Sequence, residues 1–311
     1  MITRDAERYV STLVRWYVGT SVKLCVLASA LICCIMAGSS AAYATAPQRV
    51  VSLKPSITDV VYALGLGDRL IGVTRYCFAP DGMRKPEVVA DYTRPYSERI
   101  VALSPDIVLG SMENSSRRSI ESLEQTGIRV ELFPFTTLAD TMQSIRKIAA
   151  VLGEPARGEA LARDIQAKLD ALKARWSGSA PLRAVVVWGT RPLVVAGPGA
   201  YMDELLASVG AENAVRATKI KYPRIGLEEL IAIDPDVIVD LSMGSEAAKS
   251  AQGDRPWNNA STLKAVREGK VIAMDAGMFR AGPRLVEGLT RLAELLHEDK
   301  SPSFVRRGKG R

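Results

Sequence analysis

The chain has 311 residues, with 41 Lys and Arg against 34 Asp and Glu, a formal net charge of +7 and 47% hydrophobic residues. This length gives room for two domains of ordinary size, each able to bury its own core. The basic residues form no clustered face in the body of the chain, which argues against a nucleic-acid partner. A single histidine argues against a zinc or manganese site built from a histidine cluster, and against most histidine-based acid–base catalysis.

Residues 1–44 have the pattern of a secretory signal peptide. An apolar run from Leu24 to Ala37 is too short to span a bilayer comfortably, and it follows a basic leader and precedes small residues. The small-x-small sequence AYA at residues 42–44 predicts cleavage after Ala44. Cys33 and Cys34 lie in no usual lipobox. The alternative is an uncleaved membrane anchor, because the basic leader is unusually long.

Cleavage of this segment would leave Cys77 alone in the mature chain, so no intrachain disulfide is possible. Without a partner histidine, Cys77 is expected to be a packed loop residue rather than a nucleophile. The net charge would fall from +7 to +5, because the leader carries four basic and two acidic residues. Residues 299–311 form a basic tail that we expect to be frayed.

The body of the chain begins with a strand and a helix. RVVSL at residues 49–53 predicts a buried strand, and the following helix can be capped by Ser56 with Asp59 three residues on. This helix is expected to end at Gly65, and Leu70–Val73 predicts the second strand.

Residues 74–95 show no clean period and predict a long loop at the carboxyl end of that strand. Rings and cations there indicate a ligand wall, because open α/β sheets bind ligands at the carboxyl ends of their strands. The alternative is that the rings pack back on their own lobe. The residues concerned are Arg75, Tyr76, Phe78, Tyr92 and Arg94.

One stretch occurs twice, as ERIVALSPDIVLG at residues 98–110 and EELIAIDPDVIVD at residues 228–240, at a constant offset of 130 residues. Each copy predicts a helix, a Pro-Asp turn and a buried parallel strand. Each is followed by a second predicted helix and strand. The economical interpretation is two related α/β lobes with the functional site between them.

Between the copies, a strand is predicted at Arg129–Phe133 and a helix at Leu138–Leu152. The longest helical pattern is Pro155–Trp176, whose 22 residues at 1.5 Å each would span about 33 Å and act as a rigid spacer. Because this connection is stiff, we expect small lobe closure rather than a wide hinge motion.

The second lobe is predicted to contain further strands and helices. Strands are expected at Arg183–Trp188, Leu193–Ala196 and Val271–Met274, and helices at Met202–Val209 and Arg284–Leu296. His297, at the end of the last helix, is expected on the surface. The predicted organisation is a signal peptide (1–44), an N-terminal α/β lobe (48–153), a linking helix (154–178), a C-terminal α/β lobe (181–298) and the basic tail (299–311).

The second lobe also contributes rings and cations to the predicted gap between lobes. Such a lining suits a large, flat, partly apolar ligand with anionic or amide groups, because rings supply stacking area and guanidinium groups supply forked donors. The sequence has no Walker loop, no G-x-G-x-x-G opening a helix and no G-x-S-x-G elbow. The residues of this lining are Trp188, Arg191, Tyr222, Phe279, Arg280 and Arg284.

Several segments in the same order resemble the substrate-binding proteins of ABC importers for cobalamin, haem and ferric siderophores. The resemblance runs from about Val50 to Leu296 and includes the long single helix. The spacing is most similar to the cobalamin-binding members. The segments are RVVSLKPSITDVVYALG, ERIVALSPDIVLG, YPRIGLEELIAIDPDVIV and MFRAGPR.

The resemblance implies a fold of two Rossmann-like lobes with central parallel sheets joined by one long rigid α-helix, and a monomeric periplasmic protein without catalysis. It implies that Tyr76, Tyr92, Tyr222 and Arg280 face a corrinoid, with Trp188 beside them. The corrinoid would be cargo, and no resident cofactor or metal is implied.

The same resemblance implies that Glu98 and Glu228, one on each lobe, dock to arginines of a membrane permease dimer that works with ATPase subunits. Helix-start acids are the alternative for these two residues, since a carboxylate in the first turn is favourable in any helix.

Other interpretations remain open on the sequence alone. Tyr76 or Tyr92 could serve as an axial phenolate to haem iron, so haem or a ferric siderophore is the alternative ligand. An enzyme such as a chelatase or a redox protein of similar lobes would ordinarily need a histidine or cysteine cluster. A surface-anchored interaction module would retain the leader.

Overall fold

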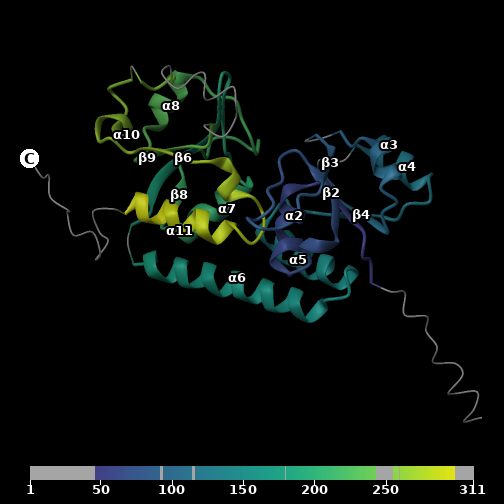
Figure 1. Cartoon of the computed structure of the whole chain (residues 1–311). Helices are drawn as coiled ribbons and strands as arrows, with labels where there is room; N and C mark the ends of the chain where they lie inside the picture. The colour runs from purple at the N-terminus through teal and green to yellow at the C-terminus, as the bar shows by residue number, and fades with distance from the viewer. Residues whose placement is uncertain are drawn as a thin grey trace, which may run out of the picture. The chain divides into compact units, whose positions relative to one another are not determined.

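Two five-stranded sheets and one long helix between them in sequence form the framework of the chain (Figure 1). The residues that the structure describes, from Ala46 onward, belong to one compact unit. Residues 1–44, 299–311 and Tyr92 are outside the part that the structure describes. Among the described residues, no helix combines the length and apolar character needed to cross a membrane. This computed structural model describes residues 46–91, 94–113, 116–178, 180–242, 255–258 and 260–297.

Sheet A, in the first lobe, is fully parallel with the strand order β3-β2-β1-β4-β5. Parallel pairing requires crossover connections, which the helices of this lobe provide. The strands are β1 (Val50–Ser52), β2 (Leu70–Thr74), β3 (Glu87–Ala90), β4 (Ile107–Ser111) and β5 (Val130–Phe133). The helices are α2 (Pro55–Ala63), η1 (Gly67–Arg69), α3 (Ser97–Ala102), α4 (Arg117–Glu124) and α5 (Leu138–Val151).

Sheet B, in the second lobe, has the order β10-β9-β6-β7, with β8 also paired to β6. Only β7 is antiparallel to its partner among these pairs. The strands are β6 (Leu182–Thr190), β7 (Leu193–Val195), β8 (Ala211–Asn213), β9 (Val237–Asp240) and β10 (Val271–Ala273). The helices are α7 (Tyr201–Leu206), η2 (Ala207–Val209), α8 (Leu227–Ile233), α10 (Lys264–Arg267), η4 (Ala276–Phe279) and α11 (Leu285–Leu296).

Alternate residues of each sheet enter different cores, because successive side chains of a strand point to opposite faces. In β1, Val50 belongs to a core that both lobes share, whereas Val51 packs in a separate core with α3 and α4. In β6, Val186 belongs to the shared core, whereas Val185 packs in a separate core with α8 and α10. Each lobe therefore turns one sheet face inward and covers the other with its own short helices.

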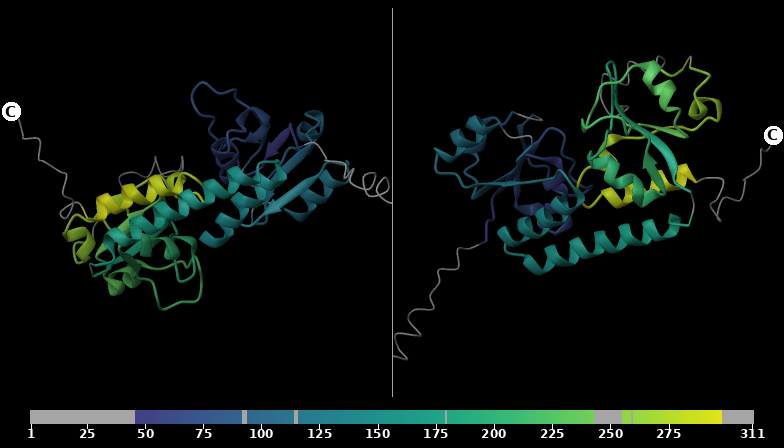
Figure 2. Two further views of the ribbon diagram at one scale, coloured as in Figure 1. Left: turned by 90° about the horizontal axis from the view of Figure 1, so that it is seen from below. Right: turned by 180° about the vertical axis from the view of Figure 1, so that it is seen from behind.

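The long helix α6 (Pro155–Trp176) contributes a stripe of residues to the shared core, among them Ala162, Ile165, Leu169 and Trp176. In both views of Figure 2, α6 runs alongside α5 and α11, which contribute to the same core. The helix has the predicted bounds. It is thus packed along its length against both lobes.

The repeated stretch forms the predicted helix, turn and strand in both lobes, and the turns are closed by the same contacts. Asp106 accepts hydrogen bonds from the backbone N–H of Arg49 at 2.8 Å, and Asp236 from that of Arg183 at 2.8 Å. The guanidinium of Arg49 donates to the Leu103 carbonyl at the end of α3.

The second copy repeats this last contact, because the guanidinium of Arg183 donates to the Ile233 carbonyl at the end of α8. A residue with positive φ follows each helix, Ser104 at 45° two positions after the end of α3 and Asp234 at 41° directly after α8. An arginine at the start of each lobe's first strand therefore satisfies carbonyls that the helix end leaves without intrahelical partners.

Some local expectations are wrong. Ser56 does not cap α2: the helix begins at Pro55 after Lys54, and Ser56 is buried within its first turn. Proline at the first position explains this start, since its missing N–H has no intrahelical partner there anyway. Two strands were not predicted, β3 within the expected loop 74–95 and β8 after Gly210. Each is a short run that includes a charged residue, Glu87 in β3 and Glu212 in β8, so the apolar pattern of a buried strand is missing.

His297 is also not on the surface. Its ring is 4% exposed and stacks on Trp176 with ring centroids 3.9 Å apart and planes at 14°. Its Nε2 lies 2.9 Å from the Val209 carbonyl oxygen. Gly210, at φ 70°, leaves room for this stack, because a Cβ there would lie 2.9 Å from the Trp176 Cβ. The stack joins the end of α6 to the second lobe.

The crossing of α5 and α6 depends on a glycine. A Cβ added at Gly158 would lie 2.3 Å from the Cβ of Ala149, far inside van der Waals contact. Because both helices belong to the shared core, a wider crossing would open that core as well.

We expect Gly158→Ala to lower the free energy of unfolding by about 1–3 kcal/mol, since overpacking outweighs the better helix propensity of alanine. Chemical denaturation monitored by circular dichroism would measure this. The control is Gly178→Ala, where an added Cβ meets nothing within 4 Å. Equal stability of both variants would contradict the tight crossing.

Candidate functional site

Residues from both lobes meet where loops leave the carboxyl ends of β2 and β10. The guanidinium carbon of Arg280, which follows η4, lies 5.9 Å from the ring centroid of Phe78, in the loop after β2. Gly282 approaches the other lobe too, because a Cβ at that position would lie 3.6 Å from the Ser56 carbonyl oxygen. The segment after η4 therefore lies against the first turn of α2.

Asp59, on α2, belongs to the same junction. It interacts electrostatically with Arg280 and Arg284 of the other lobe. Within the described chain it makes no hydrogen bond or ion pair. Burial raises the pKa of the Asp59 carboxyl, and the two arginines oppose this effect. We call Asp59, Phe78, Arg280 and Arg284 the inter-lobe cluster.

A ring pair lies at the same edge of sheet B as the Arg280 loop. Trp188, near the carboxyl end of β6, and Tyr222 have centroids 6.4 Å apart with planes at 79°, an edge-to-face arrangement. Tyr222 is 45% exposed. The Trp188 indole N–H is buried without a hydrogen-bond partner in the described chain. The pair therefore combines a partly exposed tyrosine with a buried indole N–H that has no hydrogen-bond partner among the described residues.

The predicted ligand residues differ in their placement. Tyr76 is 44% exposed on the loop after β2, and Arg284 is exposed at the start of α11. Phe279 does not fit the predicted lining: its ring is 2% exposed and packs in the shared core, because η4 turns it inward. Tyr92 lies outside the described residues.

Sequence reasoning assigned Asp59 to a helix cap and left Phe78 out of the most favoured ligand residues. Phe78 is 66% exposed, and the Arg280 guanidinium lies over its ring. Phe78 therefore belongs to the contact between the two lobes. The signal for Phe78 was present in the ring-rich loop. No local pattern could have linked Asp59 to arginines more than two hundred residues away.

Cys77 is packed, as predicted. Its sulfur lies 3.1 Å from the Thr58 hydroxyl and 3.2 Å from the Thr74 hydroxyl. Burial raises the pKa of the thiol, which lowers its reactivity. In the described part of the chain, no group of three or more His, Cys, Asp or Glu side chains could hold a metal ion.

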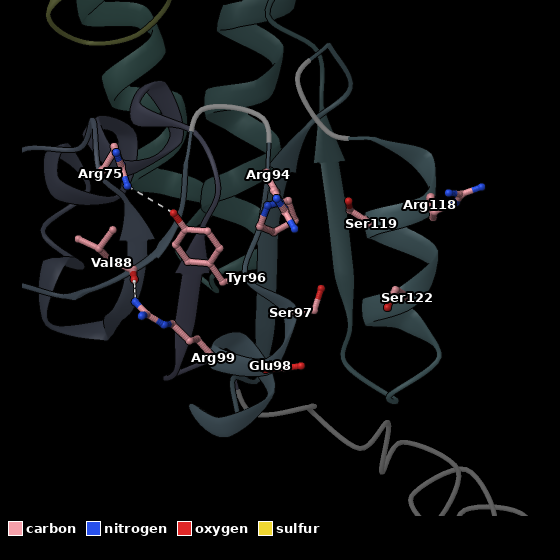
Figure 3. Close-up of a pocket in the computed structure, with 11 residues that line it drawn as sticks. Arg75, Val88, Arg94, Tyr96, Ser97, Glu98, Arg99, Arg118, Ser119 and Ser122 are labelled. Carbon is pink, nitrogen blue, oxygen red and sulfur yellow. Dashed lines mark hydrogen bonds between the residues drawn. The ribbon is translucent and has the colours of Figure 1, made fainter.

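Glu98 and Glu228 are both exposed and both occupy the second position of their helices, α3 and α8. A cavity of about 830 Å³ lies beside Glu98 (Figure 3). Its lining includes Arg94, Ser97 and Arg118. Glu98 thus projects from a polar, open surface of the first lobe.

The comparison with family models matches residues 50–277 to the periplasmic binding protein family. The chain belongs to this family. It is 31% identical over 290 residues to the vitamin B12-binding protein of Pectobacterium atrosepticum, an alignment that covers 91% of this chain and 98% of that relative. It is also 30% identical over 257 residues to the vitamin B12-binding protein of Photorhabdus laumondii, covering 82% of this chain and 90% of that relative.

Similar proteins of known structure are named for different ligands. The periplasmic vitamin B12-binding protein BtuF of Vibrio cholerae aligns with a TM-score of 0.70 at 26% identity, covering 82% of this chain and 99% of that one. A periplasmic haem-binding protein of Pseudomonas aeruginosa aligns with a TM-score of 0.70 at 29% identity, covering 81% and 93%. The fold predicted from the sequence is confirmed.

These comparisons also decide between the protein classes that the sequence left open. The family is one of periplasmic binding proteins, and the relatives are named for vitamin B12, which they bind. The chain is therefore a substrate-binding protein of a transport family, and the interpretation as a chelatase or redox enzyme is not supported.

The raised pKa of Asp59 predicts a pH dependence of stability. The folded state binds this proton more tightly than the unfolded chain, in which the pKa is about 3.9, so ionisation of Asp59 costs stability as the pH rises through the folded-state pKa. We expect Asp59→Asn to be more stable than the wild type at neutral pH, with the difference vanishing towards about pH 4. Urea denaturation across this pH range measures it, and a pH-independent difference would contradict it.

Proposed function

We propose that this protein captures a corrinoid between its two lobes and delivers it to a membrane permease. The observation that carries the proposal is the inter-lobe cluster, in which Arg280 of one lobe lies over Phe78 of the other. A ligand held there would contact both lobes at once. The exposed faces of Tyr76 and Tyr222 would add stacking area.

The vitamin B12-binding relatives support the corrinoid, since the alignment with the Pectobacterium atrosepticum protein spans nearly the whole of that chain. Haem is the second candidate, supported by the haem-binding structural neighbour and by Tyr76, whose exposed phenol could ligate iron. A ferric siderophore is a weaker form of the same alternative.

The proposal places the mature protein in the periplasm as a monomer, after cleavage of residues 1–44. Glu98 and Glu228 would each address one subunit of a permease dimer that is driven by ATPase subunits. Their exposure and their equivalent positions on α3 and α8 support this pairing.

Titration of the purified protein with cyanocobalamin, then with hemin, followed by absorbance, tests the ligand. We expect cyanocobalamin to bind, and Arg280→Ala to weaken it by about tenfold or more, the cost of a lost charge-assisted hydrogen bond. Arg118→Ala is the control, since Arg118 is exposed on α4 away from the cluster. Binding of hemin alone would replace the corrinoid with haem as the ligand.

Charge reversal tests the docking role of the two glutamates. Glu98→Arg combined with Glu228→Arg should abolish uptake of the ligand by cells while leaving the affinity of the purified protein unchanged. The matched control combines Glu121→Arg with Glu229→Arg, one exposed reversal on each lobe, the second in the same helical turn as Glu228. Uptake that persists in the first variant would leave Glu98 and Glu228 as helix-start acids only.

A further inference from the structure

The Asp59 carboxylate has an unusual position for an acidic residue. It lies on α2, three residues after Ser56, whose carbonyl oxygen faces the segment around Gly282 in the other lobe. Arg280 and Arg284 flank that segment and interact with the carboxylate electrostatically. Nevertheless, none of the described residues hydrogen-bonds or ion-pairs with Asp59. Asp59 is half-buried, and its carboxylate has no hydrogen bond within the described chain that would offset this partial burial.

The charges of the cluster distinguish ligands with acid groups from ligands with amide groups. Two guanidinium groups alone would suit a ligand with two carboxylates, such as haem with its propionates. Asp59 removes part of that advantage by adding a negative charge beside the two cations. The ionised Asp59 side chain can only accept hydrogen bonds, and so can a carboxylate of the ligand. The two carboxylates therefore cannot hydrogen-bond to each other, and their negative charges repel.

A primary amide satisfies both kinds of group. Its oxygen can accept from Arg280 or Arg284, and its NH₂ group can donate to Asp59. The side chains at the rim of a corrinoid are such amides, and they carry no charge. The mixed charge of the cluster therefore complements an amide-bearing rim better than a carboxylate-bearing one.

We infer that Asp59 is a specificity-determining residue, which directs this site to amide-bearing corrinoids and against carboxylate-bearing haem. The inference rests on the proposed function, because it concerns the ligand held between the lobes. In this role Asp59 acts by its negative charge and its hydrogen-bond acceptors, with Arg280 and Arg284 as its counterparts.

The test compares the affinities of the full mature protein for cyanocobalamin and hemin at about pH 8, where carboxyl groups are ionised. Asp59→Asn keeps the shape and removes the charge. We expect it to bind hemin more tightly and cyanocobalamin no better, so that the ratio of the two affinities shifts towards hemin by about tenfold. Asp68→Asn, the same charge change at an exposed residue of η1, should leave the ratio unchanged.

A second variant covers the case in which Asp59→Asn does not fold. Arg284→Gln, at an exposed position, removes a cation and should shift the ratio in the opposite direction, towards cyanocobalamin. An unchanged ratio in a folded Asp59→Asn variant, or in Arg284→Gln if the first does not fold, overturns the inference while the proposed function stands. A wild-type protein that binds only hemin, or neither chromophore, overturns both.

Discussion

The structure depends on one apolar core that continues from the first lobe through α6 into the second. Val50 of sheet A, Val186 of sheet B and Ile165 of α6 all belong to it. Moving one lobe far from the other would expose this surface to water at a cost of about 25 cal/mol per Å². The shared core therefore opposes a wide opening of the two lobes. It also fixes the relative position of their loops, so that Arg280 lies over the ring of Phe78.

The two outer cores are separate from this one, and they carry the repeated units. Each contains a short helix with an exposed glutamate at its second position, and an arginine binds a carbonyl at the end of that helix, Arg49 in one lobe and Arg183 in the other. The arginine binds the end of the helix and the Pro-Asp turn leads into the following strand, so the glutamate has the same position in the repeated unit of both lobes. Duplication thus yields two exposed glutamates at equivalent positions, one on each lobe.

The inter-lobe cluster, the ligand site that we propose, lies at a junction of units that fold locally. Its arginines come from the segment between η4 and α11, and its carboxylate comes from α2, at opposite ends of the chain. Neither lobe alone supplies both charges. A ligand bound at this junction would therefore contact a combination of charges that exists only in the assembled protein.

The sequence by itself determined the duplicated helix–turn–strand units, the bounds of α6 and the family, because Pro-Asp turns, helical periodicity and motif order are local signals. Only the tertiary structure decided the positions of Asp59, Phe279 and His297. The sequence predicted a cap residue, a ligand-facing ring and a surface histidine, but each side chain is instead placed by residues far away in the chain: the arginines of the other lobe, the shared core and Trp176. Burial is a property of the packed chain, and a local pattern carries no information about which distant element will cover a residue.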